Sequence, residues 1–171
     1  MDSKCCTVIR YPIRTRYNVI QRKEEKMKIA IGCDHAAFEL KEAVKKKLTS
    51  DGYEVLDMGC HSTESVDYPK YGHAVGKAVA SGEAEQGICI CSSGIGISMA
   101  ANKVPGVRAG LVHSVHTAHM TKQHNNANVL CFGANVVDKD LAFAMVDEWL
   151  NTEFEGGRHE RRVNEIEDLD F

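Results

Sequence analysis

The sequence predicts an α/β protein with a doubly wound, Rossmann-like fold: a three-layer sandwich in which helices cover both faces of a five-stranded parallel sheet. Two observations lead to this prediction. Short apolar runs of strand length alternate with longer segments whose apolar residues recur at helical spacing. The chain has 171 residues, 43% of them hydrophobic, which suffices for one domain with a substantial core. Regular alternation of strands and helices favours a parallel sheet.

The first strand is expected at residues 28–33, where KIAIGC forms a short apolar run. The other four strands are expected at 53–58, 86–91, 107–112 and 129–132. The first helix is expected at 36–50, because Ala37, Val44 and Leu48 recur on one face and lysines cover the other. Further helices are expected at 71–81, 95–103, 115–124, 138–150 and 158–168, with a polar loop over 59–68.

Composition excludes several classes of protein. No apolar run approaches the length of a membrane span, and no secretory apolar region follows the N-terminus. The net charge of −3 gives no reason to expect a nucleic-acid partner. The seven cysteines are odd in number and irregularly spaced, and several fall in strand-like runs. Reduced thiols and a cytoplasmic location are therefore expected.

Residues 1–26 differ in character from the rest of the chain. Seven basic and three acidic side chains fall in this segment, which has little core-forming periodicity. Met27 begins the first clear strand. We therefore expect a basic, flexible extension over 1–26, in preference to a targeting peptide, and a folded domain over 27–171 that ends in a helix.

The segment 87–99, GICICSSGIGISM, carries the strongest chemical signal. Cys91 stands where a buried strand enters a glycine-rich turn and a helix. Free backbone N–H groups and the helix dipole stabilise a thiolate or an oxyanion at such a junction. A cysteine phosphatase would need arginine where Ile97 stands, and only one residue separates Cys89 from Cys91, which excludes a CxxC redox pair. A thiolate base beside an anion cradle, or a buried structural cysteine before a tight turn, remain as alternatives.

Three other groups of residues are candidates for a site. Asp34 and His35 follow the first strand and could act as base and donor, or Asp34 could simply cap the next helix. His124, at the end of a helix, could transfer protons or stabilise the helix terminus. Arg158 and Arg162 share a helix face and could grip a phosphate, or pair with nearby glutamates.

No metal site is expected from the histidines. The three that lie close together in sequence point progressively apart on a helix, and no cysteine or carboxylate pattern completes a site. These residues are His113, His116 and His119.

Together these segments resemble the type B ribose-5-phosphate isomerases, a family that also includes galactose-6-phosphate and allose-6-phosphate isomerases. The resemblance extends from Lys28 to Ile166 and leaves residues 1–26 outside it. The matching segments are Ile31–His35, Asp67–Pro69, Cys91–Ser98, Ala100–Lys103, His124–Asn125 and Glu155–His159 with Arg162.

The resemblance implies a doubly wound homodimer with active sites at the subunit interface. It implies interconversion of ribose 5-phosphate and ribulose 5-phosphate without a metal or an organic cofactor. In this family pattern Cys91 is the base that carries a proton between C2 and C1, and Ser93 assists proton transfer at the oxygens. Asp34 and His124 would open the furanose ring.

The resemblance also implies a set of substrate-binding residues. His35, Arg158 and Arg162 would hold the phosphate, and backbone N–H groups from Gly94 to Ser98 would hold the enediolate. The full expected binding set is His35, Tyr68, Ser92, Gly94, Ile95, Gly96, Ser98, Asn125, Arg158 and Arg162.

Two positions depart from the family pattern. Ser92 replaces the glycine that usually follows the catalytic cysteine, and Asn135 stands where many members have a phosphate-binding arginine. The substrate could therefore be a hexose 6-phosphate, since the proton-transfer residues would be the same. A non-catalytic sugar-phosphate-binding protein is a further alternative, although such a protein would not need the Cys91 thiol.

Overall fold

A computed structural model describes residues 26–168 as one sheet with helices on both sides. The five strands are all parallel, in the order β2-β1-β3-β5-β4, which confirms the predicted sheet. The strands are β1 (Lys28–Cys33), β2 (Glu54–Asp57), β3 (Gln86–Cys91), β4 (Ala109–Leu111) and β5 (Val129–Gly133). The expectation for the extension 1–26 falls almost wholly outside the described residues.

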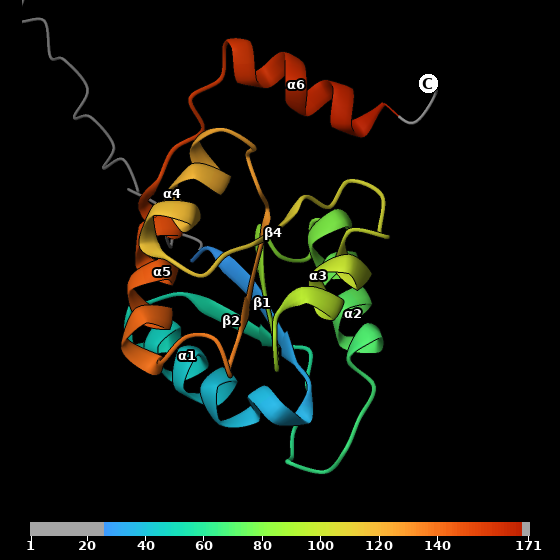
Figure 1. Cartoon of the computed structure of the whole chain (residues 1–171), viewed down its shortest axis with the longest axis vertical. Coiled ribbons are helices and arrows are strands. Elements are labelled where there is room, and N and C mark those ends of the chain that lie inside the picture. Colours follow the sequence, from blue (N-terminus) through green and yellow to red (C-terminus); the bar gives the residue numbers. More distant parts are fainter. Residues whose placement is uncertain (1–25, 169–171) are drawn as a thin grey trace, which may run out of the picture.

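The helices form the two outer layers of the predicted sandwich. Figure 1 shows α1, α4 and α5 on one face of the sheet and α2 and α3 on the other. Their bounds are α1 (Phe38–Ser50), α2 (Tyr68–Ala80), α3 (Ile95–Ala101), α4 (Val115–Gln123), α5 (Lys139–Asn151) and α6 (Arg158–Glu167), with a short 3₁₀ turn, η1 (His35–Ala37), before α1.

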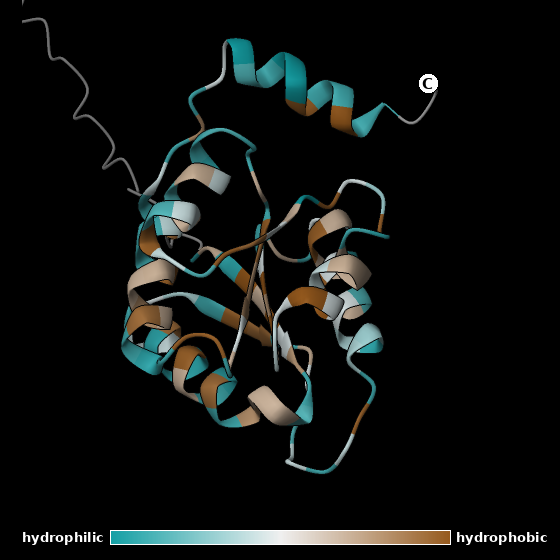
Figure 2. Cartoon of the chain, viewed as in Figure 1, coloured by the Kyte–Doolittle hydropathy of each residue, from teal (hydrophilic) through white to brown (hydrophobic). Residues whose placement is uncertain are grey.

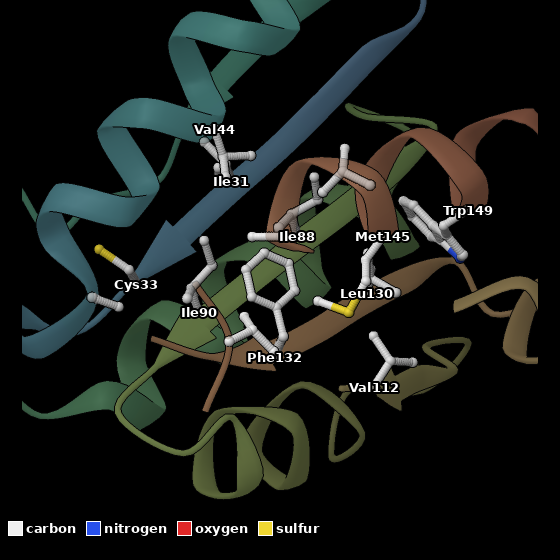
Figure 3. Packing of buried hydrophobic residues seen from close by; sticks show 14 of the residues in the cluster. Ile31, Cys33, Val44, Ile88, Ile90, Val112, Leu130, Phe132, Met145 and Trp149 are labelled. Carbon is white, nitrogen blue, oxygen red and sulfur yellow. The ribbon is translucent and has the colours of Figure 1, made fainter. Parts of the chain in front are cut away.

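The core lies in two clusters, one on each face of the sheet. Alternate residues of β3 enter different clusters: Ile88 and Ile90 pack with α1 and α5, whereas Cys89 and Cys91 pack with α2 and α3. Figure 3 shows the larger cluster, where Phe132 of β5 meets the β3 isoleucines. A strand buried on both faces has no polar side, so β3 reads as a continuous apolar run.

Several boundaries differ from the sequence prediction, and three of these differences have a clear local cause. α2 begins at Tyr68, three residues earlier than predicted, because Pro69 lies in its first turn, where a missing N–H costs nothing. The first helix begins as the 3₁₀ turn η1, and the Asp34 carboxylate accepts a hydrogen bond from the Ala37 N–H at 3.2 Å.

β4 is the third difference, with three residues instead of six. The Val107 N–H closes a turn onto the Val104 carbonyl, and the Arg108 N–H donates to the Asn128 side chain at 2.8 Å. These two N–H groups are therefore used outside the ladder. The Asn102 amide supplies the outer edge of β4 with both a donor to the Ala109 carbonyl and an acceptor for its N–H, at 2.9 and 2.8 Å.

Candidate active site

Cys91 is the last residue of β3, and its side chain is almost fully buried. The backbone N–H of Gly94 donates to the Cys91 sulfur at 3.1 Å. A donor aimed at the sulfur stabilises the thiolate, and the thiolate is the form of cysteine that acts as a base. The predicted junction of strand, thiol and helix N-terminus is thus present.

The turn after Cys91 requires glycine at position 94. Gly94 has φ +78°, the left-handed region that other residues rarely adopt, and it is the N-cap of α3. A Cβ built there would lie 2.6 Å from the Leu111 side chain and 2.7 Å from the Phe132 backbone. Both conformation and space exclude a side chain, so the chain can place the Gly94 N–H against the sulfur.

Not every N–H at the start of α3 is free. The Ile95 N–H donates to the Ser93 hydroxyl at 3.3 Å, and the Ser98 N–H donates to the Gly94 carbonyl. The Ser98 hydroxyl also bonds inside the helix, to the Ile95 carbonyl at 2.7 Å. Within residues 26–168, the N–H groups of Gly96 and Ile97 find no acceptor. Of the backbone N–H groups expected to bind the enediolate, these two are therefore free to do so. The N–H and the hydroxyl of Ser98 are already bonded at the start of the helix.

Tyr68 lies against the same turn. Its ring covers Gly96 so closely that a Cβ on Gly96 would lie 2.5 Å from the ring carbon that bears the hydroxyl. Tyr68 is 39% exposed. The first residue of α2 therefore presents a phenol beside Gly96.

Asp34 and His35 lie at the end of the neighbouring strand β1, and β1 pairs directly with β3. Asp34 caps η1, so the helix-capping alternative holds, yet its second carboxylate oxygen has no hydrogen bond within residues 26–168. The His35 Nδ1 accepts a hydrogen bond from the Val66 N–H at 3.2 Å. A neutral His35 therefore carries its proton on Nε2 and can donate it to an anion.

Ser92 and Asn135 contact each other across the loops that follow β3 and β5. The Asn135 amide donates to the Ser92 hydroxyl at 2.8 Å, and its backbone N–H donates to the Ser92 carbonyl at 3.0 Å. The two departures from the family pattern are thus one hydrogen-bonded unit beside Cys91.

His124 and Asn125 lie at the opposite end of the sheet. α4 starts after the carboxyl end of β4 and runs back to the amino end of β5, so its last residues lie at the amino edge. The guanidinium of Arg108, just before β4, donates to the Asn126 carbonyl at 3.0 and 3.1 Å, which confirms this placement. α6 lies over this same end in Figure 1, and its Glu167 pairs with Arg108.

A second cluster of polar residues forms at this amino edge. The imidazole rings of His124 and His159 stack, with centroids 4.1 Å apart and planes 8° from parallel. A Glu155 carboxylate oxygen lies 3.8 Å from the His124 Nε2 and 3.9 Å from the His159 Nε2. The Glu155 N–H donates to the Gln123 carbonyl, which ties the segment before α6 to the end of α4.

Charge and burial act on His159 in this cluster. Burial and the neighbouring His124 lower the pKa of His159, and Arg158 and Arg162 act in the same direction, against the opposing effect of Glu155. The Arg158 Nε–H donates to the His159 Nε2 at 3.3 Å, and the neighbouring Arg161 pairs with Glu165.

The structure therefore divides the expected site residues into two groups. Cys91, Ser93, Asp34 and His35 meet at the carboxyl edge, and His124, Asn125 and Arg158 meet at the amino edge. Five steps of about 3.3 Å separate the first and last of the six residues of β3, so the two edges are roughly 17 Å apart. Asp34 and His124 are not brought together within one chain.

Sequence reasoning assigned no role to Glu155 or His159 beyond their place in a matching segment. Their i, i+4 spacing was the only local signal, and the contact with His124 is tertiary. With His124 they are also the described residues whose ligand atoms, all within 4.8 Å, could hold a metal ion. The three histidines considered from the sequence are separated: His119 pairs with Glu148 at 2.7 Å, and His116 is exposed.

Comparison with known proteins identifies the class of protein as an isomerase of sugars. A family model described as Ribose/Galactose Isomerase matches residues 29–166, and the chain belongs to this family. The ribose-5-phosphate isomerase B of Escherichia coli is 49% identical over 139 residues, which cover 81% of this chain and 93% of that protein. A putative sugar phosphate isomerase of Bacillus subtilis is 42% identical and covers 84% of this chain and 97% of its own length.

Solved structures agree. The ribose-5-phosphate isomerase B of Clostridium thermocellum has a TM-score of 0.83 at 51% identity, covering 84% of this chain and 97% of that one. The corresponding protein of Mycoplasma genitalium, solved with bound ribulose 5-phosphate, covers 82% of this chain and 94% of its own, with a TM-score of 0.79 at 39% identity. The resemblance inferred from the motifs is confirmed.

One finding concerns membranes. Among the helices of residues 26–168, none combines the length and the apolar character that crossing a bilayer requires.

Proposed function

We propose that this protein interconverts ribose 5-phosphate and ribulose 5-phosphate, with Cys91 as the base. The Cys91 sulfur carries the proposal: it accepts the Gly94 N–H at 3.1 Å, close to two N–H groups at the start of α3 that lack acceptors within residues 26–168. The relative from Escherichia coli bears the name of this isomerase, and the relative from Mycoplasma genitalium binds ribulose 5-phosphate.

The proposed chemistry starts from the open-chain aldehyde. The Cys91 thiolate removes the proton from C2, and the electron pair of the C2–H bond moves through C1 onto O1 to give an enediolate. The N–H groups of Gly96 and Ile97 hold the developing negative charge. The thiol returns the proton to C1, and Ser93 assists transfer of the O2 proton to O1, which leaves a ketone at C2. No atom is gained or lost, as an isomerisation requires.

Asp34 and His124 are proposed to open the furanose ring first. The unoccupied oxygen of Asp34 would accept the proton of the O1 hydroxyl, and His124 would donate a proton to the ring oxygen as the C1–O4 bond breaks. The His35 Nε2–H, Arg158 and Arg162 would hold the phosphate dianion. Tyr68, Ser92 and Asn125 would contact the sugar hydroxyls.

This chemistry needs two subunits, because the two groups of residues lie at opposite edges of one sheet. We propose a homodimer in which the carboxyl edge of one subunit faces the amino edge of its partner. Exposed apolar residues favour such an interface beside Cys91: Ile95 is 48% and Met99 63% exposed on α3, and Leu111 on the edge strand β4 is 37% exposed. Ile166 of α6, 54% exposed, adds an apolar position to a helix that is otherwise mostly hydrophilic (Figure 2).

We also propose a cytoplasmic location. The five described cysteines are free thiols, and Cys33 and Cys60 remain unbonded with their sulfur atoms 3.7 Å apart. Free buried thiols in proximity fit a reducing compartment.

The experiment is turnover of ribose 5-phosphate in the presence of EDTA, by the unchanged protein and by Cys91→Ala. The unchanged protein is expected to turn over, and Cys91→Ala to lose about 10³-fold or more in kcat while it binds substrate within about threefold. Cys89→Ala is the matched control, since Cys89 lies on the same strand face. Turnover of a hexose 6-phosphate alone, or full activity of Cys91→Ala, would contradict the proposal.

A further inference from the structure

The proposed mechanism does not use His159, a residue of the amino-edge cluster. It is 5% exposed, and its ring lies plane to plane on the ring of His124. The His124 side chain is 32% exposed, so one face of its ring is covered by His159 while the other part remains accessible. A buried aromatic ring that packs flat on a proposed proton donor fixes the plane of that donor.

His159 is itself firmly held. Its backbone N–H donates to the Gly156 carbonyl at 3.0 Å, and its Nε2 accepts the Arg158 Nε–H at 3.3 Å. Glu155 faces both rings, and its own backbone is tied to the end of α4. His159 is therefore a fixed surface, against which the less buried His124 ring rests.

The parallel stacking of the two imidazole rings argues against metal binding by His124, His159 and Glu155. The lone pair of an imidazole nitrogen lies in the plane of its ring, and two rings only 8° from parallel cannot direct their lone pairs at one ion. The His159 Nε2 lone pair is also occupied by Arg158. A metal would require one ring to turn and Arg158 to leave, and two arginines add repulsion.

We propose that His159 is a positioning residue, which holds the imidazole plane of His124 so that its free edge faces the sugar ring oxygen. This inference rests on the proposed function, because His124 acts there in ring opening. Proton transfer depends steeply on orientation, and a misplacement of about 1 Å can cost about 10²-fold in rate. A neutral His159 ring also avoids charge repulsion when His124 is protonated, and the lowered pKa of His159 favours that neutral form.

The two directions of the reaction separate this role from a general structural one. Ribose 5-phosphate is mainly a closed ring and must be opened. Ribulose 5-phosphate cannot close into a furanose, because its C5 oxygen carries the phosphate, and it enters the reaction as an open chain. A defect in His124 orientation should therefore affect turnover of ribose 5-phosphate far more than turnover of ribulose 5-phosphate.

The experiment compares His159→Ala and His159→Phe with the unchanged protein in both directions. With saturating substrate, we expect His159→Ala to lose about 10-fold or more in kcat for ribose 5-phosphate and less than about threefold in kcat for ribulose 5-phosphate, which can leave as the open-chain aldehyde. The comparison uses kcat, because the ratio of the two kcat/KM values is fixed by the equilibrium constant. His159→Phe keeps a flat ring and should recover most of the loss. His116→Ala, an exposed position on α4, is the matched control and should leave both directions unchanged.

NMR of the His124 ring protons provides a readout that does not depend on turnover. Their upfield ring-current shift should vanish in His159→Ala and persist in His159→Phe. Equal losses of kcat in both directions, no rescue by phenylalanine, or unchanged His124 signals would overturn the positioning role. Absence of pentose-phosphate turnover by the unchanged protein would instead refute the proposed function, and the NMR comparison would still decide whether His159 orients His124.

Discussion

Ser92 and Asn135 illustrate how single residues are linked by the fold. They are 43 positions apart in sequence, and their side chains share a hydrogen bond of 2.8 Å beside the last residue of β3. Each departs from the pattern of the type B isomerases, and the structure joins the two departures. The Ser92 hydroxyl gives a hydrogen-bond partner to the Asn135 side chain, which is shorter than the arginine of many family members and is neutral.

Asn135→Arg is expected to lower KM for ribose 5-phosphate about threefold to tenfold, with little change in kcat. The guanidinium would add a charged donor at the carboxyl edge, where His35 is proposed to hold the phosphate. Steady-state kinetics provide the measurement. Asn135→Ala, which loses the bond to Ser92 without a new charge, is the control, and an unchanged or raised KM for Asn135→Arg would contradict this expectation.

The junction of β3 and α3 depends on two glycines for different reasons. Gly94 has a positive φ and backbone atoms on its crowded side, whereas Gly96 meets only the Tyr68 side chain. Backbone cannot move without disturbing β5, but the partly exposed Tyr68 ring can swing outward. A side chain at position 94 is therefore expected to destabilise the turn more than a side chain at position 96.

Gly94→Ala should destabilise the protein by about 3 kcal/mol, and Gly96→Ala by about 1 kcal/mol. Strain and a backbone clash add at position 94, whereas at position 96 one exposed ring must move. Urea denaturation of the two variants measures the difference. Equal costs at both positions would show that the left-handed conformation of Gly94 is not the dominant constraint.

A buried lysine joins α1 to the loop after β2. The Lys41 side chain is fully buried, and its ammonium donates to both Asp57 oxygens at 3.0 Å and to the Cys60 carbonyl at 2.9 Å. Burial acts to raise the pKa of Asp57, but hydrogen bonds from Lys45 and Lys41 and from the Gly59 N–H outweigh it and hold that pKa below its ordinary value. This network supports the loop whose Val66 N–H contacts His35.

The lowered pKa of Asp57 predicts a loss of stability in acid. A carboxyl group with a depressed pKa in the folded state stabilises the protein above its unfolded pKa of about 4, and this contribution is lost as pH falls through the folded value. Asp57→Asn should cost about 2 kcal/mol at pH 7 and should flatten the acid dependence, because the buried Lys41 ammonium loses one of its two carboxylate partners and keeps Glu42, 2.7 Å away. Urea titrations at neutral and acidic pH test this, with the exposed Glu54→Gln as control.

The arrangement of the entire chain separates the two halves of the proposed site. Parallel strands place Cys91 at one edge of the sheet, and the return of α4 places His124 at the other. The carboxyl edge has the proposed base Cys91 and the ring-opening carboxylate of Asp34, but it lacks the ring-opening acid His124. The amino edge has His124 but neither of the other two. If the proposed dimer forms, each site takes Cys91 from one subunit and His124 from its partner.

Mixing two inactive variants tests this arrangement. Cys91→Ala and His124→Ala should each lack activity toward ribose 5-phosphate as homodimers, but after subunit exchange half of the dimers are mixed, with one intact site each. About a quarter of the unchanged activity should then return. The measurement is turnover after joint denaturation and refolding, with each variant treated alone as control. No recovery would contradict a shared site.

The elements with strong sequence patterns were predicted well. The five parallel strands and the three layers followed from apolar runs and helical periodicity, because a buried strand and an amphipathic helix each leave a regular trace. The misplaced boundaries, at Tyr68 and at the ends of β4, depend on single proline and asparagine contacts. Asn102, which bonds the outer edge of β4 from the end of α3, has no periodic signature.

The local sequence determined the Cys91 turn, because a strand, two glycines and a helix start are contiguous there. It also determined that Asp34 follows β1 and caps the next turn. The stack of His159 on His124, the bond between Ser92 and Asn135, and the placement of His124 at the edge opposite Cys91 were decided only by tertiary structure. Such contacts depend on strand order and on the direction in which helices return, and these arise from packing among segments distant in the chain.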